Sequence, residues 1–298
     1  MGFFFAFMVG LGFASGNILV RKGMKQSDEQ DNGVLTTVII NVIFLGIAWL
    51  IYRLLYVTVE LNWIGTLYYV FAGIFTTFLG RQTLFMSYRK IGAPRGSAIK
   101  NSAPLFTAVF ALVILGETMG WLPFAGFVFV LLGLGIQGLF MIRQGNKLST
   151  DMHVERIGYY LALASAMSFG VGQGIRKSGL LELPDPYYGA FISGLVALLM
   201  TILWEARTGN IREKLIGQVK RYNPFYLAAG VCTSIAMLSF FIAITYIQVS
   251  YVAAVAALEP LLTIILSKLF LKQEEIQRYT IVASMTVFAG VLMLILFT

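Results

Sequence analysis

The chain has 298 residues, of which 58% are hydrophobic and only 12% are charged. Soluble domains are about half apolar and a quarter charged, so this composition excludes a water-facing surface and fits a lipid bilayer instead. The net charge of +8 does not indicate nucleic-acid binding, because the basic residues lie in short segments between apolar runs, where they orient helices and meet anionic lipid.

Ten apolar runs predict ten membrane-spanning helices. Each is close to the ~20 residues that cross a ~30 Å hydrocarbon core. The runs are continuous rather than alternating, which favours helices over a barrel. The first begins at Gly2 and is followed by Arg21 and Lys22, the reverse of the charge order in a signal peptide, so we expect it to be retained. The runs are 2–20, 34–56, 63–88, 94–115, 121–142, 157–175, 187–204, 225–247, 250–271 and 279–297.

The sequence also repeats internally. Residues 91–107 align without gaps on residues 247–263, and residues 20–22 align on residues 175–177. We therefore expect an all-α membrane protein of two five-helix halves, residues 1–145 and 146–298. Because five is odd, the second half must be inverted, which places a solute site between the halves near mid-membrane. Two fused halves can enclose such a site alone, so a monomer is compatible with the pattern.

The basic residues predict an orientation in the cell membrane. The segments after spans 1, 3, 5, 7 and 9 hold 17 Lys and Arg, whereas the other face holds only Arg53, Arg176 and Lys177. The positive-inside bias then puts both termini on the non-cytoplasmic side. Ile211, Leu215 and Val219 repeat every four residues among basic ones, which is typical either of an amphipathic helix on the inner leaflet or of an ordinary solvated loop.

Three ionisable residues lie deep in predicted spans: Arg81, Lys100 and Glu259. A charge at the centre of a membrane helix costs at least ~2.5–3.5 kcal/mol, so such residues normally face the bundle interior and mark a pathway. Their sum of +1 favours an anionic group on the solute, and a desolvated Glu259 could also couple proton movement. The alternatives are a fixed ion-pair network that only joins helices, and an Arg81 that extends toward the interface.

Two prolines and several polar residues complete the candidate site. Pro104 and Pro260 occupy matching positions of the repeat, and each removes the hydrogen bond to the carbonyl four residues earlier. We expect matching kinks that either shape a cavity or serve only mechanically. Further polar residues are candidate ligands, or interhelical hydrogen bonds: Gln82, Asn101, Gln173 and Tyr246.

Other motifs argue against enzyme chemistry. Gly133, Gly135 and Gly138 match a dinucleotide fingerprint, but they lie inside an apolar span rather than after a strand. The pairs Gly12/Gly16 and Gly170/Gly174 are better explained as close helix crossings. The single cysteine, Cys232, and the single histidine, His153, offer no disulfide or metal set. We expect no cofactor, no metal and no enzymatic activity.

Residues 91–117, IGAPRGSAIKNSAPLFTAVFALVILGE, resemble the fourth helix of the drug/metabolite transporter superfamily, EamA type, which ends in Leu-Gly-Glu. Residues 253–275 repeat the pattern, with Lys272-Gln273-Glu274 at the corresponding turn. The resemblance covers essentially the whole chain. It implies ten spans in inverted halves, solute export or exchange that is often proton-coupled, and a path lined by helices 3, 4, 8 and 9.

We therefore expect a secondary active transporter that exports a small metabolite with an anionic group, such as an amino or organic acid, by alternating access. Arg81, Lys100, Asn101, Glu259, Tyr246 and Gln82 are the predicted binding residues, with Glu259 for coupling and Pro104 and Pro260 for shaping the cavity. The alternatives are an exporter of cations that uses Glu259, and a non-transporting membrane sensor or assembly partner.

Overall fold

A computed structural model describes residues 1–24, 33–56, 60–148, 156–207, 223–271 and 278–298. Two sequence patterns lie outside these ranges: the amphipathic repeat at 211–219 and the turn at 272–274. The described residues form helices and contain no strand. The elements are α1 (Gly2–Met24), α2 (Val34–Leu55), α3 (Trp63–Ala72), η1 (Gly73–Gly80), α4 (Arg81–Ile91), α5 (Ala93–Lys100), α6 (Ala103–Val113), α7 (Trp121–Leu148), α8 (Ile157–Glu182), α9 (Pro186–Arg207), α11 (Pro224–Tyr246), α12 (Val249–Ala256), α13 (Glu259–Leu271) and α14 (Arg278–Phe297).

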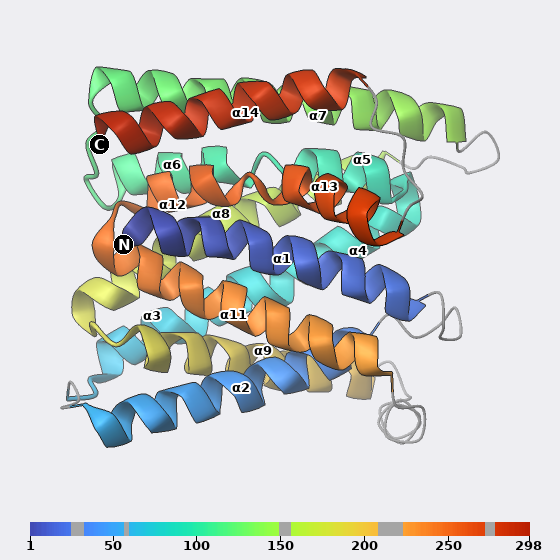
Figure 1. Cartoon of the computed structure of the whole chain (residues 1–298). Helices are drawn as coiled ribbons and strands as arrows, with labels where there is room; N and C mark the ends of the chain where they lie inside the picture. Colours follow the sequence, from blue (N-terminus) through green and yellow to red (C-terminus); the bar gives the residue numbers. More distant parts are fainter. Residues whose placement is uncertain (25–32, 57–59, 149–155, 208–222, 272–277) are drawn as a thin grey trace.

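These elements make ten passes through one layer of membrane thickness (Figure 1). The third pass is α3–η1–α4, the fourth is α5–α6 and the ninth is α12–α13. Eight passes are long and apolar enough to span a bilayer by composition, and the apolar part of α14, Ile281–Phe297, is shorter. The remaining pass, α8, is 26 residues long but richer in polar and small residues. The predicted all-helical, polytopic fold is confirmed.

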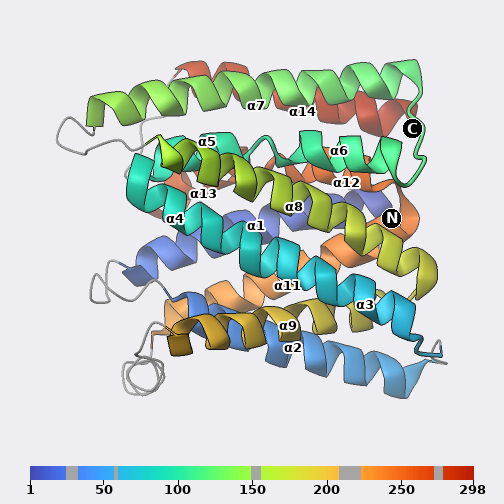
Figure 2. The same ribbon diagram turned by 180° about the vertical axis from the view of Figure 1, so that it is seen from behind.

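The two halves are inverted with respect to each other. In Figure 1, α1 and α8, the first helices of the two halves, run in opposite directions, and both chain termini lie at the same face. We call this face the termini face, and the opposite one, where α1, α4, α7, α9 and α13 end, the basic-loop face. The pairings repeat as well: α1 packs on α11, and α8 packs on α3, η1 and α4 (Figure 2). The helix α7 continues to Leu148, three residues past the predicted limit of the first half.

The predicted glycine crossings are close helix contacts, but with different partners. A Cβ on Gly12 would lie 2.8 Å from the Ala236 Cβ of α11, whereas one on Gly174 would lie 2.1 Å from the Phe110 ring of α6. Two residues before Gly174 in α8, a Cβ on Gly172 would lie 2.5 Å from Cγ2 of Thr76 in η1. The small residues of α8 therefore let it approach η1 and α6 together, which explains why this helix is less apolar than a lipid-facing one.

The two passes that contain Pro104 and Pro260 are broken at matching points, as the repeat predicts. The break in the fourth pass is at residues 101–102 and the break in the ninth is at residues 257–258, so Pro104 and Pro260 are each the second residue of the half-helix that follows. Each proline stands in the first turn of the helix that follows, where its missing N–H costs nothing. The breaks divide each pass into two half-helices whose ends lie at mid-depth.

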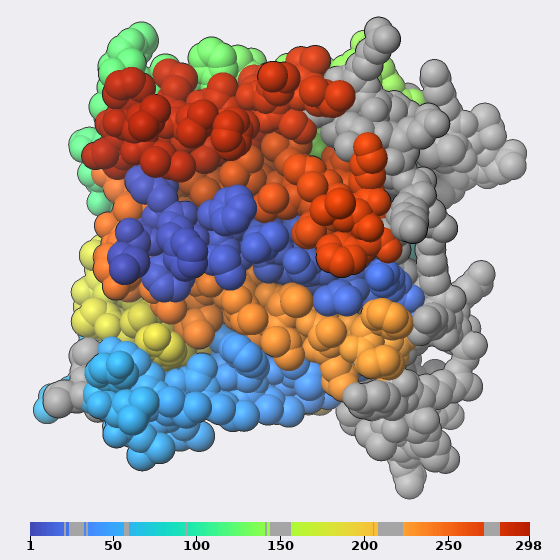
Figure 3. Space-filling view, viewed as in Figure 1, coloured from blue at the N-terminus to red at the C-terminus, as the bar shows by residue number. Residues whose placement is uncertain are grey.

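The space-filling view shows α1 between α11 and α13 on one side of the bundle (Figure 3). A glycine places α1 against the second break, since a Cβ on Gly10 would lie 3.5 Å from the backbone O of Ala256 and 3.5 Å from the N of Glu259. Gly170 of α8 stands in the same way against Ala103 O after the first break, at 2.8 Å. The first helix of each half thus supports the broken pass of the other half.

Candidate functional site

The two breaks place one cation and one anion where helix ends favour them. Lys100 is the last residue of α5, and Glu259 is the first residue of α13. A helix carries partial negative charge at its C-terminus and partial positive charge at its N-terminus. The Lys100 ammonium and the Glu259 carboxylate are therefore each stabilised by their own half-helix, which lowers the cost of holding charge at this depth.

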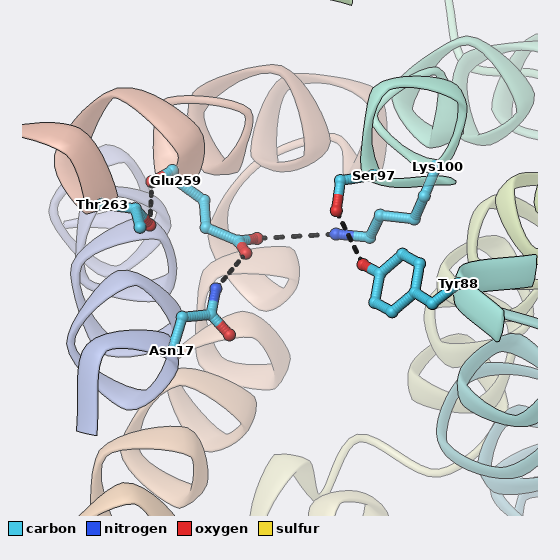
Figure 4. Close-up of polar contacts among 6 residues, drawn as sticks. All are labelled: Asn17, Tyr88, Ser97, Lys100, Glu259 and Thr263. Atoms are coloured by element: carbon cyan, nitrogen blue, oxygen red, sulfur yellow. Dashed lines mark hydrogen bonds and ion pairs between the residues drawn. The ribbon is translucent and has the colours of Figure 1, made fainter. Parts of the chain in front are cut away.

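Lys100 and Glu259 point toward each other across the interface between the halves (Figure 4). Lys100 Nζ lies 3.7 Å from Glu259 Oε2, and 23% and 22% of the two side chains remain exposed. Asn17 of α1 donates a hydrogen bond to Glu259 Oε1 at 2.9 Å. The Glu259 carboxylate thus contacts both a cation and an amide donor, while the pair is loose enough to stay partly accessible.

The surroundings of Lys100 are aromatic and polar. Its Nζ lies 5.4 Å from the centre of the Phe169 ring of α8, within the range of a cation–π contact. The Tyr88 and Ser97 hydroxyls form a 2.7 Å hydrogen bond beside the Lys100 side chain (Figure 4). Hydroxyls, an amide and an aromatic face around an ammonium are typical of a site that orients a small polar molecule.

Arg81 stands at mid-depth directly after an unusual element. It is the first residue of α4 and follows the eight-residue π-helix η1. It stands ten positions before Ile91, so its Cα lies about 15 Å from the basic-loop end of α4, deeper than the span limits suggest. A Cβ on the neighbouring Gly80 would lie 3.0 Å from the Phe169 ring, which also contacts Lys100. Arg81 is half-buried and, in the part of the chain described, pairs with no carboxylate.

The other predicted binding residues separate into two groups. Gln82 is half-buried next to Arg81 in α4, and Asn101 is half-buried next to Lys100 at the first break. Tyr246 is not near the pair. It ends α11 at the termini face, is 61% exposed, and stacks on Phe5 at 6.4 Å. Tyr246 lines a cavity of about 680 Å³ there together with Lys177. The third candidate amide, Gln173, accepts an interhelical hydrogen bond from Thr107 at 2.9 Å.

Asn17 and Arg176 were not singled out as site residues from the sequence, and Arg176 was placed at a helix end. Asn17 was overlooked because a single amide in an apolar run is common in membrane helices. Arg176 was assigned to a helix end, but α8 continues to Glu182, so Arg176 lies inside the helix and is only 6% exposed. The boundary was misjudged because Arg176 and Lys177 end the apolar run. Its alignment with Arg21 in the repeat also favoured a helix-end position.

Glu117, the end of the Leu-Gly-Glu turn, joins the two halves. Its Oε1 accepts a hydrogen bond from the Val249 backbone N–H at 2.8 Å, and its Oε2 accepts one from the Ser250 hydroxyl at 2.7 Å. Both partners belong to the first turn of α12, which has no side-chain cap of its own. A carboxylate at this position satisfies free N–H groups and complements the helix dipole. Glu117 therefore caps α12 from the opposite half.

Among the described residues, no group of three or more His, Cys, Asp or Glu could hold a metal ion. The candidate site consists of one ion pair, one further cation and neutral donors. Such a set can bind and release a charged small molecule, but it contains no activated nucleophile.

Comparisons with known proteins place the chain in a family and identify its fold. The profile of the EamA-like transporter family matches residues 1–137 and 156–296, one match in each half. A protein of Bacillus subtilis (strain 168), "Uncharacterized transporter YvbV", is 29% identical over 202 residues, which are 66% of this chain and 61% of that protein. A solved crystal structure covers 99% of this chain and 97% of its own with a TM-score of 0.69. Its 14% identity shows a shared fold alone.

Proposed function

The chain belongs to the EamA-like transporter family, and from this premise we propose that it is a secondary active transporter for a small metabolite that carries an anionic group. The membrane and the transport class follow from the family. The solute class rests on one observation, the excess of cations over anions at the depth of the two breaks. Lys100, Arg81 and Glu259 sum to +1, and Glu259 is already neutralised by Lys100.

An anionic solute would complete this charge set. Its carboxylate or phosphate would meet Lys100 and Arg81, while Asn101 and Gln82 would supply neutral hydrogen bonds. A cation exporter would instead need a carboxylate free to bind the solute, and Glu259 already contacts both Lys100 and Asn17. This contact set favours the anionic class over the cationic one.

The ion pair also supplies a route to coupling. A proton on Glu259 would remove its charge and free the Lys100 ammonium for the solute. The anionic solute would do the same by competing with the carboxylate. Proton and solute would then bind in a linked manner at one place, which is the requirement for coupled transport. The broken passes around the pair would let the two halves rock about it.

The test is a set of variants reconstituted in liposomes. A thermal-shift screen of amino acids, organic acids and nucleotides at pH 5.5 and pH 7.5 first identifies a solute. Lys100→Ala is then expected to reduce its flux ~10- to 100-fold, since a charge-assisted contact is typically worth ~1.5–3 kcal/mol, and an unpaired Glu259 adds to the loss. Lys268→Ala, an exposed lysine of α13, is the matched control and should transport normally.

The charge-swapped double variant distinguishes solute binding by Lys100 from an ion pair that only joins helices. If the pair only joins helices, Lys100→Glu with Glu259→Lys should restore flux, because the attraction is preserved. If Lys100 binds the solute, the swap should stay inactive while remaining folded. Normal flux in Lys100→Ala with Glu259→Gln would rule out the site. No flux and no thermal shift with any solute would instead favour a sensor or assembly partner.

Orientation is part of the same proposal. The basic residues at the ends of α1, α4, α7 and α13 support a cytoplasmic basic-loop face, with both termini outside, in the cell membrane. A cysteine at the exposed position 60, in a Cys232→Ala background, should react with an impermeant maleimide in intact cells. If that cysteine reacts only after the cells are lysed, the opposite orientation is correct.

A further inference from the structure

Arg176 is a buried cation that the proposed site does not use. It lies in α8, six residues before Glu182, and is 6% exposed. Its Nη2 donates a hydrogen bond to Thr76 Oγ1 of η1 at 2.7 Å. Its guanidinium carbon lies 5.3 Å and 5.1 Å from the ring centres of Phe240 and Phe241 of α11. Arg176 thus stands where α8 and α11 of the second half meet η1 of the first.

These partners do not neutralise the guanidinium. Its Nε is buried and has no hydrogen-bond partner. Within the described ranges no carboxylate lies within ion-pair distance of it, and the ion pair found there is Lys100–Glu259. One hydroxyl and two aromatic faces cover less of an arginine than its five N–H donors require. An unneutralised charge inside a membrane protein is costly and normally marks a pathway. A mere helix staple would be served better by a neutral amide.

The three deep cations form a series across the membrane. At 1.5 Å per residue, the Lys100 Cα lies about 10 Å and the Arg81 Cα about 15 Å from the basic-loop ends of α5 and α4. Arg176 lies about 28 Å from the basic-loop end of α8 and about 9 Å from its termini-face end. An anion that crosses between the halves would meet Lys100, Arg81 and Arg176 in turn.

We propose that Arg176 is a second anion-binding residue, on the termini-face half of the path, and that Thr76, Phe240 and Phe241 cover it while this face is closed. A closed termini face accords with the burial of α12, whose residues 249–255 are all buried, whereas its repeat counterpart α5 keeps Ser97, Ile99 and Lys100 partly accessible. When this face opens, α8 and α11 move away from η1, and the guanidinium becomes free to bind a carboxylate or phosphate.

The π-helix gives this exchange a structural basis. Thr76 lies inside η1, and Arg81 follows its last residue. Each hydrogen bond of a π-helix spans one more residue than in an α-helix, and π-helical turns are frequent at functional sites. If residues 73–80 returned to an α-helix, the side chains of Thr76 and Arg81 would rotate relative to each other about the helix axis, and Thr76 would turn away from Arg176. One local change would therefore release the outer cation and reorient the inner one. This inference rests on the proposed transport of an anion.

The experiment measures the local preference for anions without knowing the solute. The full chain in nanodiscs, with Cys232→Ala and the reporter Phe240→Cys, reacts with two thiol reagents of similar size. One is the anionic 2-sulfonatoethyl methanethiosulfonate, and the other is the cationic 2-(trimethylammonium)ethyl methanethiosulfonate. The ratio of their rate constants, divided by the ratio for a small thiol in solution, is expected to be roughly 10, because a unit charge acts strongly at close range in a partly dehydrated path.

Three further variants make the result specific. Arg176→Gln should lower the ratio roughly tenfold, whereas Arg176→Lys should keep it within about threefold. Arg53→Gln is the matched control, because it removes the same charge from an exposed position of α2 near the same face, and it should leave the ratio unchanged. Thr76→Val should keep the ratio but raise both rates several-fold, since it removes the bond that holds Arg176 covered.

Several outcomes would overturn the proposal. A reporter that reacts with neither reagent means that Arg176 never meets the aqueous path. A normalised ratio near 1, or an Arg176→Gln ratio equal to the parent value, means that Arg176 does not attract anions there. If Arg176→Gln does not fold, the rate ratios of the parent, of Arg176→Lys and of Thr76→Val still test whether Arg176 attracts anions. A high ratio together with normal flux in Lys100→Ala would refute the central site while leaving Arg176 in place.

Discussion

Glu117 offers the sharpest structural prediction, because one carboxylate holds a helix of the other half. Replacing it with Ala leaves the Val249 N–H and the Ser250 hydroxyl without their acceptor, and both residues are fully buried. A hydrogen bond to a charged group is worth ~1.5–3 kcal/mol and an N-cap ~1 kcal/mol. Since Glu117 itself is half-exposed, we reduce the sum to about 2 kcal/mol. Glu117→Gln keeps one acceptor and should lose about half of that.

The loss should appear locally, as faster hydrogen–deuterium exchange in α12. About 2 kcal/mol corresponds to a ~30-fold higher rate of exchange if the helix opens locally. Mass spectrometry of peptides covering residues 249–256, in nanodiscs, measures this directly, and α14 provides an internal reference. Glu60→Ala is the control, because it removes an exposed carboxylate at the same face. If Glu117→Ala leaves α12 exchange within threefold of the parent, the capping argument is wrong.

The remaining predictions concern packing and pH. Gly174→Ala should lower the free energy of unfolding by ~1–3 kcal/mol, because its Cβ would overlap the Phe110 ring, whereas Gly135→Ala, with nothing within 4 Å, should be neutral or stabilising; equal melting temperatures would contradict the close-crossing account. Asp185 caps α9 by accepting from the Tyr188 N–H at 2.9 Å, and burial raises the pKa of its carboxyl above the usual value of ~3.9. Because the folded-state pKa is raised, the protonated carboxyl contributes stability at low pH, and this contribution is lost as the pH rises through the folded-state pKa. The melting temperature of the parent should therefore fall relative to that of Asp185→Asn between pH 4 and pH 7. Parallel pH profiles of the two proteins would refute this assignment.

Helix positions and the repeat could be predicted from sequence because both depend on local patterns. Continuous apolar runs of membrane length have one backbone solution, and an odd number of them per half forces inversion. The kinks at Pro104 and Pro260 were equally local, since a proline removes a specific hydrogen bond wherever it stands. Lys100 and Glu259 were identifiable as a pair because charges at depth are rare in such sequences.

Features that depend on which helices meet could not be predicted from the sequence. Nothing in the run around Thr76 predicts a π-helix, because the extra residue is accommodated by packing against Gly172 and Arg176 of a distant helix. Tyr246 looked equivalent to other polar residues in the spans, yet it ends its helix at the termini face. Arg176 looked like a terminal charge until the length of α8 was known.

The amino-acid sequence by itself determined that this protein is a ten-pass helical bundle with inverted halves and that few charges lie at depth, because hydrocarbon permits little else. Only the tertiary structure decided which of those charges meet, that Glu117 of one half caps α12 of the other, and that Arg176 is covered rather than free. Those contacts join residues more than 60 positions apart, and no local pattern fixes the rotation of one helix about its axis relative to another.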